Sequence, residues 1–343
     1  MSEVAIATPA ARARPGLLRW VRQYPPLFTL ALIVAVCVVV GTLNPAFWQV
    51  ANLFDIARAS VVRGLFALGV LCVLAGGGLD VSFTAIAALT MYATARGVAA
   101  WVPDLSMVFI LLLGAGGGAA LGTINGLLVH VLRAPSLIVT IGTQYAMQGF
   151  LLTFVGTALF TGIPSAMDRF GRVALATHRN TAGASASLPA AVLVLLAAAL
   201  LTWWILRRTL IGRAVYAVGG SETVAARLGF DLRAVRVFVF GYAGLLAGIA
   251  GIVHVSLDRL ANPFDLAGTE LGVIAAVVLG GARITGGTGT VIGTVLGTVL
   301  ITLVDNVLIL VGIPSTWQLV IVGAFIVLAG LMFSAGGGRR PVD

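Results

Sequence analysis

The sequence has no lysine and few charged residues of any kind. Of its 343 residues, 10% are charged and 59% are hydrophobic, and the mean hydropathy is +1.08. Soluble domains carry about 25% charged residues, so this chain cannot cover itself with a water-facing surface. Most of its surface must face lipid. The net charge of +9 comes from arginine alone, and it is typical of cytoplasmic loops rather than of nucleic-acid binding.

Motifs for catalysis and metal binding are also missing. Cys37 and Cys72 lie inside apolar runs, and the three histidines are far apart in the sequence, so no metal-ligand spacing exists. The chain contains neither Gly-x-Ser-x-Gly nor His-Glu-x-x-His, and it lacks the Gly-x-x-x-x-Gly-Lys-[Ser/Thr] loop that cradles ATP phosphates. We therefore expect no catalytic residue, no metal and no cofactor bound by this chain itself.

Apolar stretches fill most of the chain, and we predict that they form transmembrane helices. They run approximately over 27–43, 59–76, 82–99, 105–131, 136–157, 188–206, 235–257, 268–281, 288–311 and 316–335. The eighth is too short to cross alone and ends in Gly280-Gly281, which indicates a broken or re-entrant helix. The expected fold is an all-α polytopic membrane protein with about ten transmembrane helices over residues 27–335.

The distribution of arginine predicts the orientation. With the N-terminus inside, 14 of the 21 arginines fall on the cytoplasmic side. This bias fits an N-terminal segment 1–26 and a tail 336–343 that are both cytoplasmic. The largest outer insert is 158–187, which we expect to be a loop with a short helix. It is either a solvated connection or a contact for a delivery protein.

Two further patterns concern the architecture. Glycines spaced by four, such as Gly289, Gly293 and Gly297, favour close helix packing in lipid. Residues 68–78 (LGVLCVLAGGG) and 271–281 (LGVIAAVVLGG) are similar, which suggests two weakly related halves in a parallel repeat.

Few polar residues are expected at membrane depth, and each is a candidate for the substrate pathway because burying it in lipid is costly. These candidates are Asp80, Asn125, Gln144, Gln148, Asp305 and Asn306. Structural roles compete with the pathway role. Asp80 could cap the helix that follows it, and Asp305 could pair with an arginine. For Asn125 and Gln148, helix–helix hydrogen bonding is the alternative.

Four stretches in order resemble one known family. They are GGLDVS (77–82), NGLLVHVLRAPSLIVTIGT (125–143), the segment 212–230, in which Gly212-Arg213 precedes AVYAVGGSETVAARLGF, and the segment 279–318. They resemble the membrane permease subunit of ribose-type ATP-binding-cassette importers. Departures include Phe83-Thr84 for the family's Val-Gly, Ser221 for its Asn, and Asp305 for the first of two Asn. The acid of its Glu-Ala-Ala is displaced by one, to Glu222. These departures bear on the solute more than on the transporter class.

The resemblance implies the partners and the mechanism. Two such chains, identical or related, would form the pore in a bacterial inner membrane. An extracytoplasmic binding protein would deliver a sugar or sugar-like solute, and a separate ATPase subunit would use the ATP. Alternatives are the same machinery for a nucleoside or a furanose-derived signal molecule, or a secondary carrier.

The charged insert 207–236 would then be the contact with the ATPase, its cytoplasmic part covering 207–234. We expect Gly219-Gly220 to form a turn, Ser221 to cap a helix over 222–228, and Gly229 to end it. A basic loop held at lipid headgroups is the alternative. The candidate coupling residues are Arg213, Tyr216, Gly219, Gly220, Ser221, Glu222, Ala225 and Gly229.

Overall fold

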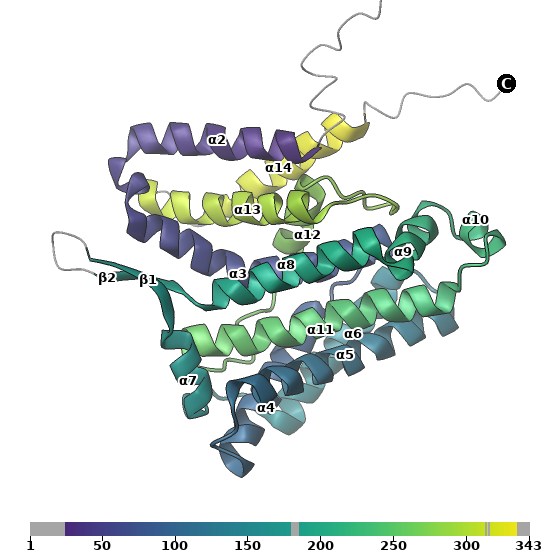
Figure 1. Cartoon of the computed structure of the whole chain (residues 1–343), viewed down its shortest axis with the longest axis horizontal. Coiled ribbons are helices and arrows are strands. Elements are labelled where there is room, and N and C mark those ends of the chain that lie inside the picture. Colours follow the sequence, from purple (N-terminus) through teal and green to yellow (C-terminus); the bar gives the residue numbers. More distant parts are fainter. Residues whose placement is uncertain (1–24, 180–184, 313, 315, 335–343) are drawn as a thin grey trace, which may run out of the picture.

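The structure is a computed structural model, and it describes residues 25–179, 185–312, 314 and 316–334. Most of the described chain is helical and the helices run lengthwise through one elongated bundle (Figure 1). The first half contains α2 (Pro25–Leu43), η1 (Pro45–Trp48), α3 (Val50–Ala75), α4 (Phe83–Trp101), α5 (Met107–Leu132), α6 (Ser136–Phe150), η2 (Leu151–Val155) and α7 (Ser165–Arg172). The second half contains β1 (Ala174–Arg179), β2 (Ser185–Pro189), α8 (Ala191–Arg208), α9 (Leu210–Gly220), α10 (Glu222–Arg227), α11 (Leu232–Asp258), α12 (Glu270–Leu279), α13 (Val291–Val311) and α14 (Trp317–Ser334).

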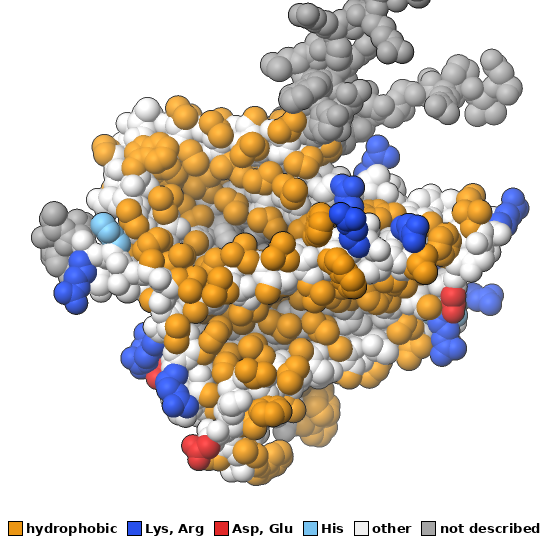
Figure 2. Space-filling model, viewed as in Figure 1, with side chains coloured by type: hydrophobic (Ala, Val, Ile, Leu, Met, Phe, Trp, Pro, Cys, Tyr) orange, Lys and Arg blue, Asp and Glu red, His pale blue; other side chains and the backbone are white. Residues whose placement is uncertain are grey.

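Every predicted span coincides with a helix, and the eighth is short: α12 has 10 residues. Seven of the described helices are long and apolar enough to cross a membrane. The visible face of the bundle is largely apolar between its two ends, and arginines gather toward those ends (Figure 2). The chain is therefore a polytopic all-α membrane protein. Of the predicted terminal segments, 1–24 and 336–343 lie outside the described residues.

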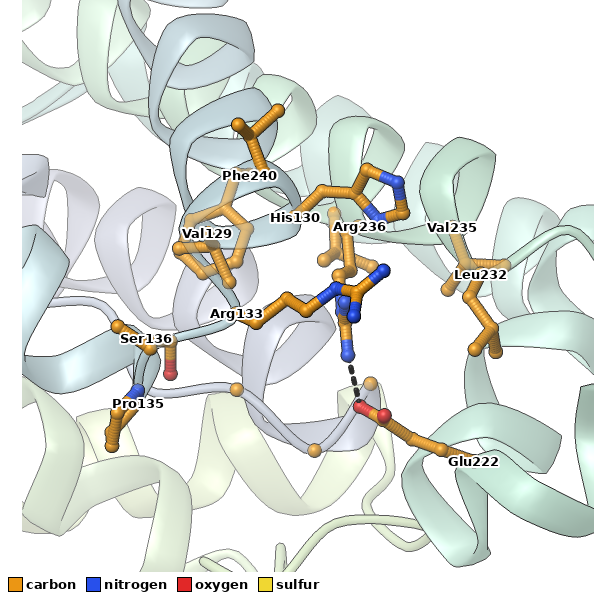
Figure 3. Close-up of a pocket in the computed structure, with 16 residues that line it drawn as sticks. Val129, His130, Arg133, Pro135, Ser136, Glu222, Leu232, Val235, Arg236 and Phe240 are labelled. Carbon is orange, nitrogen blue, oxygen red and sulfur yellow. Dashed lines mark hydrogen bonds and ion pairs between the residues drawn. The ribbon is translucent and has the colours of Figure 1, made fainter.

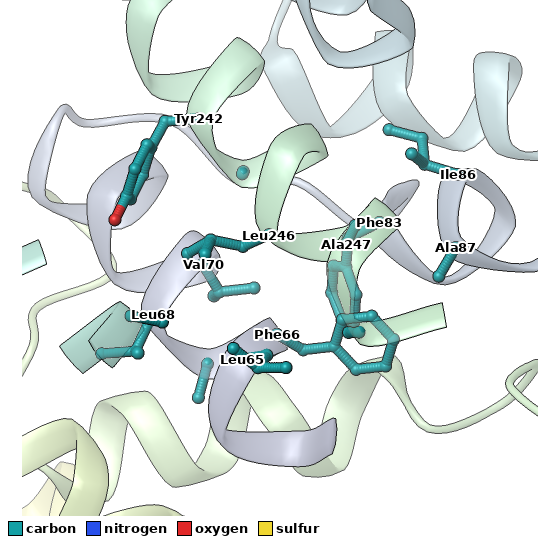
Figure 4. Close-up of a cluster of buried hydrophobic side chains, with 14 of the residues drawn as sticks. Leu65, Phe66, Leu68, Val70, Phe83, Ile86, Ala87, Tyr242, Leu246 and Ala247 are labelled. Carbon is teal, nitrogen blue, oxygen red and sulfur yellow. The ribbon is translucent and has the colours of Figure 1, made fainter. Parts of the chain in front are cut away.

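The core lies around α3, which is buried along most of its length. Side chains from α3, α4 and α11 meet there, including Leu65, Phe83 and Leu246 (Figure 4). The rings of Phe66 and Phe83 lie 5.0 Å apart between centroids, a separation typical of favourable aromatic pairs. α3 and α11 thus form the fixed centre of the bundle.

Glycine allows the closest helix pair to form. α5 and α11 share the most extensive helix–helix contact. A Cβ on Gly118 would lie 2.1 Å from the Gly244 carbonyl oxygen, and one on Gly248 would lie 1.9 Å from the Gly114 oxygen. Without a large hydrophobic driving force in lipid, such close packing is what holds helices together.

The glycines spaced by four near the C-terminal end of the chain also allow close helix packing. A Cβ on Gly293 would lie 2.0 Å from the Gly280 oxygen, and one on Gly297 would lie 1.9 Å from the Ala276 oxygen. α12 is therefore packed backbone to backbone on α13. The predicted relation between two halves stays a prediction.

The two ends of the bundle differ. One end, here called the α7 end, carries α7 and the antiparallel strands β1 and β2; the opposite end, called the α10 end, carries α9 and α10 (Figure 1). The short helix expected within 158–187 is α7. The strand pair beside it was not expected, because its small polar residues carry little strand signal.

Candidate functional site

The charged insert starts with a helix that sequence reasoning missed. α8 ends at Arg208, Thr209 caps the next helix through a 3.1 Å bond from Gly212 N, and α9 follows. Gly219 and Gly220 are the last two residues of α9, and neither has a positive φ. The predicted turn at these glycines is therefore wrong.

Gly219 is instead required for a close contact. A Cβ at this position would lie 1.9 Å from the Ala75 oxygen at the end of α3. Gly286 and Gly287 of the α12–α13 connection approach the same point, and Gly287 N donates to Ala75 O at 3.0 Å. Three segments meet here through backbone atoms alone. We call Ala75, Gly77, Gly219, Gly286 and Gly287 the glycine junction.

Tyr216 adds a fourth link at this place. Its hydroxyl donates to the Gly289 oxygen at 2.9 Å. Burial raises the pKa of Tyr216 to about 12, so the hydroxyl keeps its proton at neutral pH and remains a donor. α9 is thus fixed to the α12–α13 connection, whereas Arg213 on the same helix is exposed.

The predicted contact helix is present as α10. The Ser221 side chain accepts from Val224 N at 3.4 Å, and Gly229 ends the helix with φ +86°. Phe230 N donates back to Ala225 O at 3.1 Å, which closes a Schellman-type end. Ala225 is buried beneath the helix, while Val224 and Leu228 are 53% and 69% exposed. α10 therefore presents two apolar side chains, one helical turn apart, to its surroundings.

A cavity of about 680 Å³ opens beside α10. Arg133 from the α5–α6 connection and Arg236 from α11 both extend toward Glu222, the first residue of α10 (Figure 3). Arg236 Nη2 donates to Glu222 Oε1 at 2.6 Å. The Glu222 side chain is 54% exposed, and exposed pairs contribute only about 0–1 kcal/mol. This ion pair can therefore exchange partners at little cost.

Asp80 and Asn125 belong to one hydrogen-bonded group at the α3–α4 connection. Asp80 Oδ1 accepts from Ser82 N at 2.8 Å and from Ser82 Oγ at 2.6 Å. Asn125 Nδ2 donates to Ser82 Oγ at 2.7 Å. Asp80 and Asn125 are 1% and 0% exposed. The N-cap of α4 is Ser82, so Asp80 does not cap this helix as the alternative expected. Asp80 and Asn125 instead hold Ser82 between the α3–α4 connection and α5, and Asp80 Oδ2 and Asn125 Oδ1 are buried without a partner in the described part of the chain.

Gln144 takes part in a different polar group, which we call the α12 cluster and define as Thr84, Gln144, Gln148 and Glu270. Glu270 Oε1 accepts from Thr84 Oγ1 at 2.5 Å and from Gln144 Nε2 at 2.9 Å. Gln144 and Gln148 line one small surface hollow together with Thr84. Glu270 is only 8% exposed. The two glutamines predicted on one face of a helix are thus brought together.

The α12 cluster lies between the two ends of the bundle. At 1.5 Å per residue, Gln144 is about 12 Å from the start of α6, and Glu270 is about 13 Å from the end of α12. The hydrocarbon layer is about 30 Å thick, so these side chains lie at membrane depth. Glu270, which lies two residues after the start of the predicted stretch 268–281, is not among the candidates selected from the sequence. A carboxylate at the start of a very short apolar stretch was the available signal.

Asp305 and Asn306 lie apart from both groups. Arg63 of α3 forms an ion pair with Asp305 of α13. Pairing with an arginine is the structural role that the sequence analysis gives for Asp305 as the alternative to a place in the substrate pathway. Arg63 also lines a cavity of about 310 Å³ toward the α7 end, with Arg58 and His254. The Asn306 side-chain oxygen is buried and finds no hydrogen-bond partner in the described part of the chain.

Comparison with known proteins identifies the family. The family model for the permease component of branched-chain amino acid transport systems matches residues 52–330. The ribose import permease RbsC of Escherichia coli (strain K12) is 31% identical over 314 residues, which cover 91% of this chain and 94% of that protein. RbsC of Bacillus subtilis (strain 168) is 33% identical over 319 residues, covering 92% and 93%.

A third relative has a different name. The autoinducer 2 import system permease LsrC of Enterobacter sp. (strain 638) is 36% identical over 314 residues, covering 90% of this chain and 86% of that protein. No solved structure matches the chain. The match runs through the glycine junction, α10 and the α12 cluster, because all three lie within residues 52–330.

Proposed function

The chain belongs to this family of transport permeases, and we propose that it imports a sugar or a furanose-derived signal molecule, driven by a separate ATPase subunit. Relatives named for ribose import and for autoinducer 2 import support this solute class. We propose further that an extracytoplasmic binding protein delivers the solute at the α7 end, and that the α10 end is cytoplasmic. The excess of arginine in the segments at the α10 end supports this orientation.

The observation that carries the proposal is α10. It is a six-residue helix at one end of the bundle, held by a cap at each end, with Val224 and Leu228 exposed. We propose that this face packs into a groove of the ATPase. Closure of the ATPase would move α10, and α9 would pass the movement through the glycine junction to α3 and the α12–α13 connection. Contacts at Gly219 and Tyr216 support this route.

We also propose that two permease chains enclose one pathway. α6 and α12 carry three of the four residues of the α12 cluster, yet both leave large side chains exposed. Tyr145 is 70% exposed and Leu271 is 74% exposed. A second chain placed against these helices would close the hollow beside Gln144 and Gln148. The proposal holds for an identical or a related partner, and it requires only that the partner cover this face.

Uptake in reconstituted vesicles tests the proposal. The chain would be purified with its co-expressed ATPase and binding protein and assayed with D-ribose as the probe. We expect uptake that requires ATP, the ATPase and the binding protein together. Uptake by the chain alone, driven by an ion gradient, would refute the proposal. In the full complex, Glu222→Ala should lower uptake per ATP hydrolysed, whereas Asp104→Asn, an exposed change at the other end, should not.

A further inference from the structure

Glu270 begins a helix that starts inside the bundle. α11 ends at Asp258 near the α7 end, and residues 259–269 run from there to Glu270 without forming a helix. Irregular backbone at membrane depth is stable only where protein covers it or where it lines a water-filled space. Phe264 is 50% exposed and Leu271 is 74% exposed, so this chain alone does not cover the segment. Discontinuous helices of this kind mark binding sites in transporters.

The carboxylate of Glu270 is held by neutral donors. Thr84 and Gln144 both donate to Oε1, at 2.5 and 2.9 Å. Within the described residues, no cation pairs with Glu270 and Oε2 accepts no hydrogen bond from a side chain. Asp305 differs because Arg63 compensates its charge. Asp80 is also buried and bonded only to neutral donors, but both of its donors belong to Ser82, two residues away, whereas those of Glu270 come from two other helices. Glu270 therefore keeps one strong acceptor unused, beside the amide group of Gln144. Gln148, one helical turn further along α6, lines the same hollow as Thr84 and Gln144.

We propose that Glu270, Gln144 and Gln148 form a binding site within the membrane for an uncharged, polyhydroxylated solute. The inference rests on the proposed import function and adds the place where the solute binds during passage. Oε2 of Glu270 accepts a hydrogen bond from a solute hydroxyl, and the amide of Gln148 both donates and accepts. The uncompensated carboxylate repels anionic solutes. Thr84 acts as a positioning residue, because it occupies Oε1 and fixes the carboxylate.

Such a site should discriminate by hydroxyl groups. A solute that lacks the hydroxyl bound by Glu270 leaves the acceptor Oε2 without a donor, which disfavours its binding. We therefore expect the wild-type complex to take up D-ribose at least tenfold faster than one of its monodeoxy analogues at low solute concentration. The binding protein adds its own preference, but that contribution is the same for any variant of the permease.

The test compares this ratio between wild type and Glu270→Gln in the complete complex. We expect the variant to take up D-ribose more slowly, and its ribose-to-deoxyribose uptake ratio to fall at least threefold for one analogue. Asp104→Asn, which removes an exposed carboxylate, should leave the ratio unchanged. Glu270→Asp, which keeps the charge, should keep part of the discrimination.

The outcomes separate the inference from the proposed function. If wild type takes up ribose and Glu270→Gln slows uptake of all analogues equally, Glu270 is structural and the inference is wrong. An unchanged rate in the variant would also overturn it. If the wild-type complex takes up none of the sugars, the proposed function fails for this solute class, and the inference fails with it.

Discussion

Glu222 and Glu270 occupy the same local position in opposite surroundings. Each is the first residue of a short helix; Ser221 alone separates Glu222 from α9, whereas the non-helical residues 259–269 precede Glu270. Glu222 is largely exposed and pairs with Arg236, whereas Glu270 is buried and bonded only to neutral donors. An exposed ion pair is weak and can change partners. A buried carboxylate without a cation is costly, and its free acceptor is the proposed contact for the solute. The comparison separates the proposed coupling contact from the proposed solute contact.

The largest expected effect comes from a substitution in α9, the helix that holds α10 and its Glu222 to the bundle. Gly219→Leu places a side chain against the backbone of Ala75 and Gly287, neither of which can rotate away. We expect a loss of about 3 kcal/mol in the free energy of unfolding and loss of coupled uptake. Gly220→Leu is the matched control, since nothing lies within 4 Å of a Cβ there. Equal thermal stability of the two variants would contradict the junction.

The next effect concerns the support of Glu270. Thr84→Val removes the hydroxyl that donates to Oε1 at nearly constant volume, and we expect a cost of about 1–3 kcal/mol. Thr90 on the same helix bonds only to backbone oxygens of its own helix. Thr90→Val should therefore cost less than about 1 kcal/mol. Thermal unfolding of both variants in detergent checks the difference, and a reversed order would refute it.

Substitution of one glycine at each short helix tests how the two helices differ: Gly229 follows the end of α10, and Gly272 lies within α12. Gly229→Ala forces a residue with a Cβ into φ +86° at the end of α10, at a cost of about 1–2 kcal/mol. Gly272→Ala in α12 meets no atom within 4 Å and keeps a helical φ, so it should be neutral or stabilising. Hydrogen exchange of α10 should rise only in the first variant. Unchanged exchange there would show that Gly229 does not hold the helix.

The smallest effect is the ion pair of Glu222. A double-mutant cycle with Glu222→Gln and Arg236→Gln should give a coupling energy of about 0.2–1 kcal/mol that falls with added salt. Ribose uptake lost through Glu270→Gln should not depend on salt, because that site is buried. A coupling energy above about 2 kcal/mol would mean that Glu222 is a fixed structural partner and not an exchangeable one.

The sequence predicted features that depend on local pattern. Apolar length located the spans, and Ser221 with Gly229 located the ends of α10. Gly219-Gly220 was misread because glycine also serves close contacts, and only the fold shows that Ala75 lies against Gly219. Glu270 was missed for the same reason: its donors, Thr84 and Gln144, are 186 and 126 residues away in the chain. Long-range partners leave no trace in local spacing.

The packing of α5 on α11 has an evolutionary consequence. Gly118 and Gly244 each lie against the other's backbone, so a larger residue on one helix cannot be accommodated by a smaller one on the other. Paired substitutions therefore cannot compensate for each other at these two positions. Side chains around Glu270 face a hollow, and they can be exchanged one at a time without disturbing that pair. The proposed solute site can therefore change in sequence while the central helix pair stays constant.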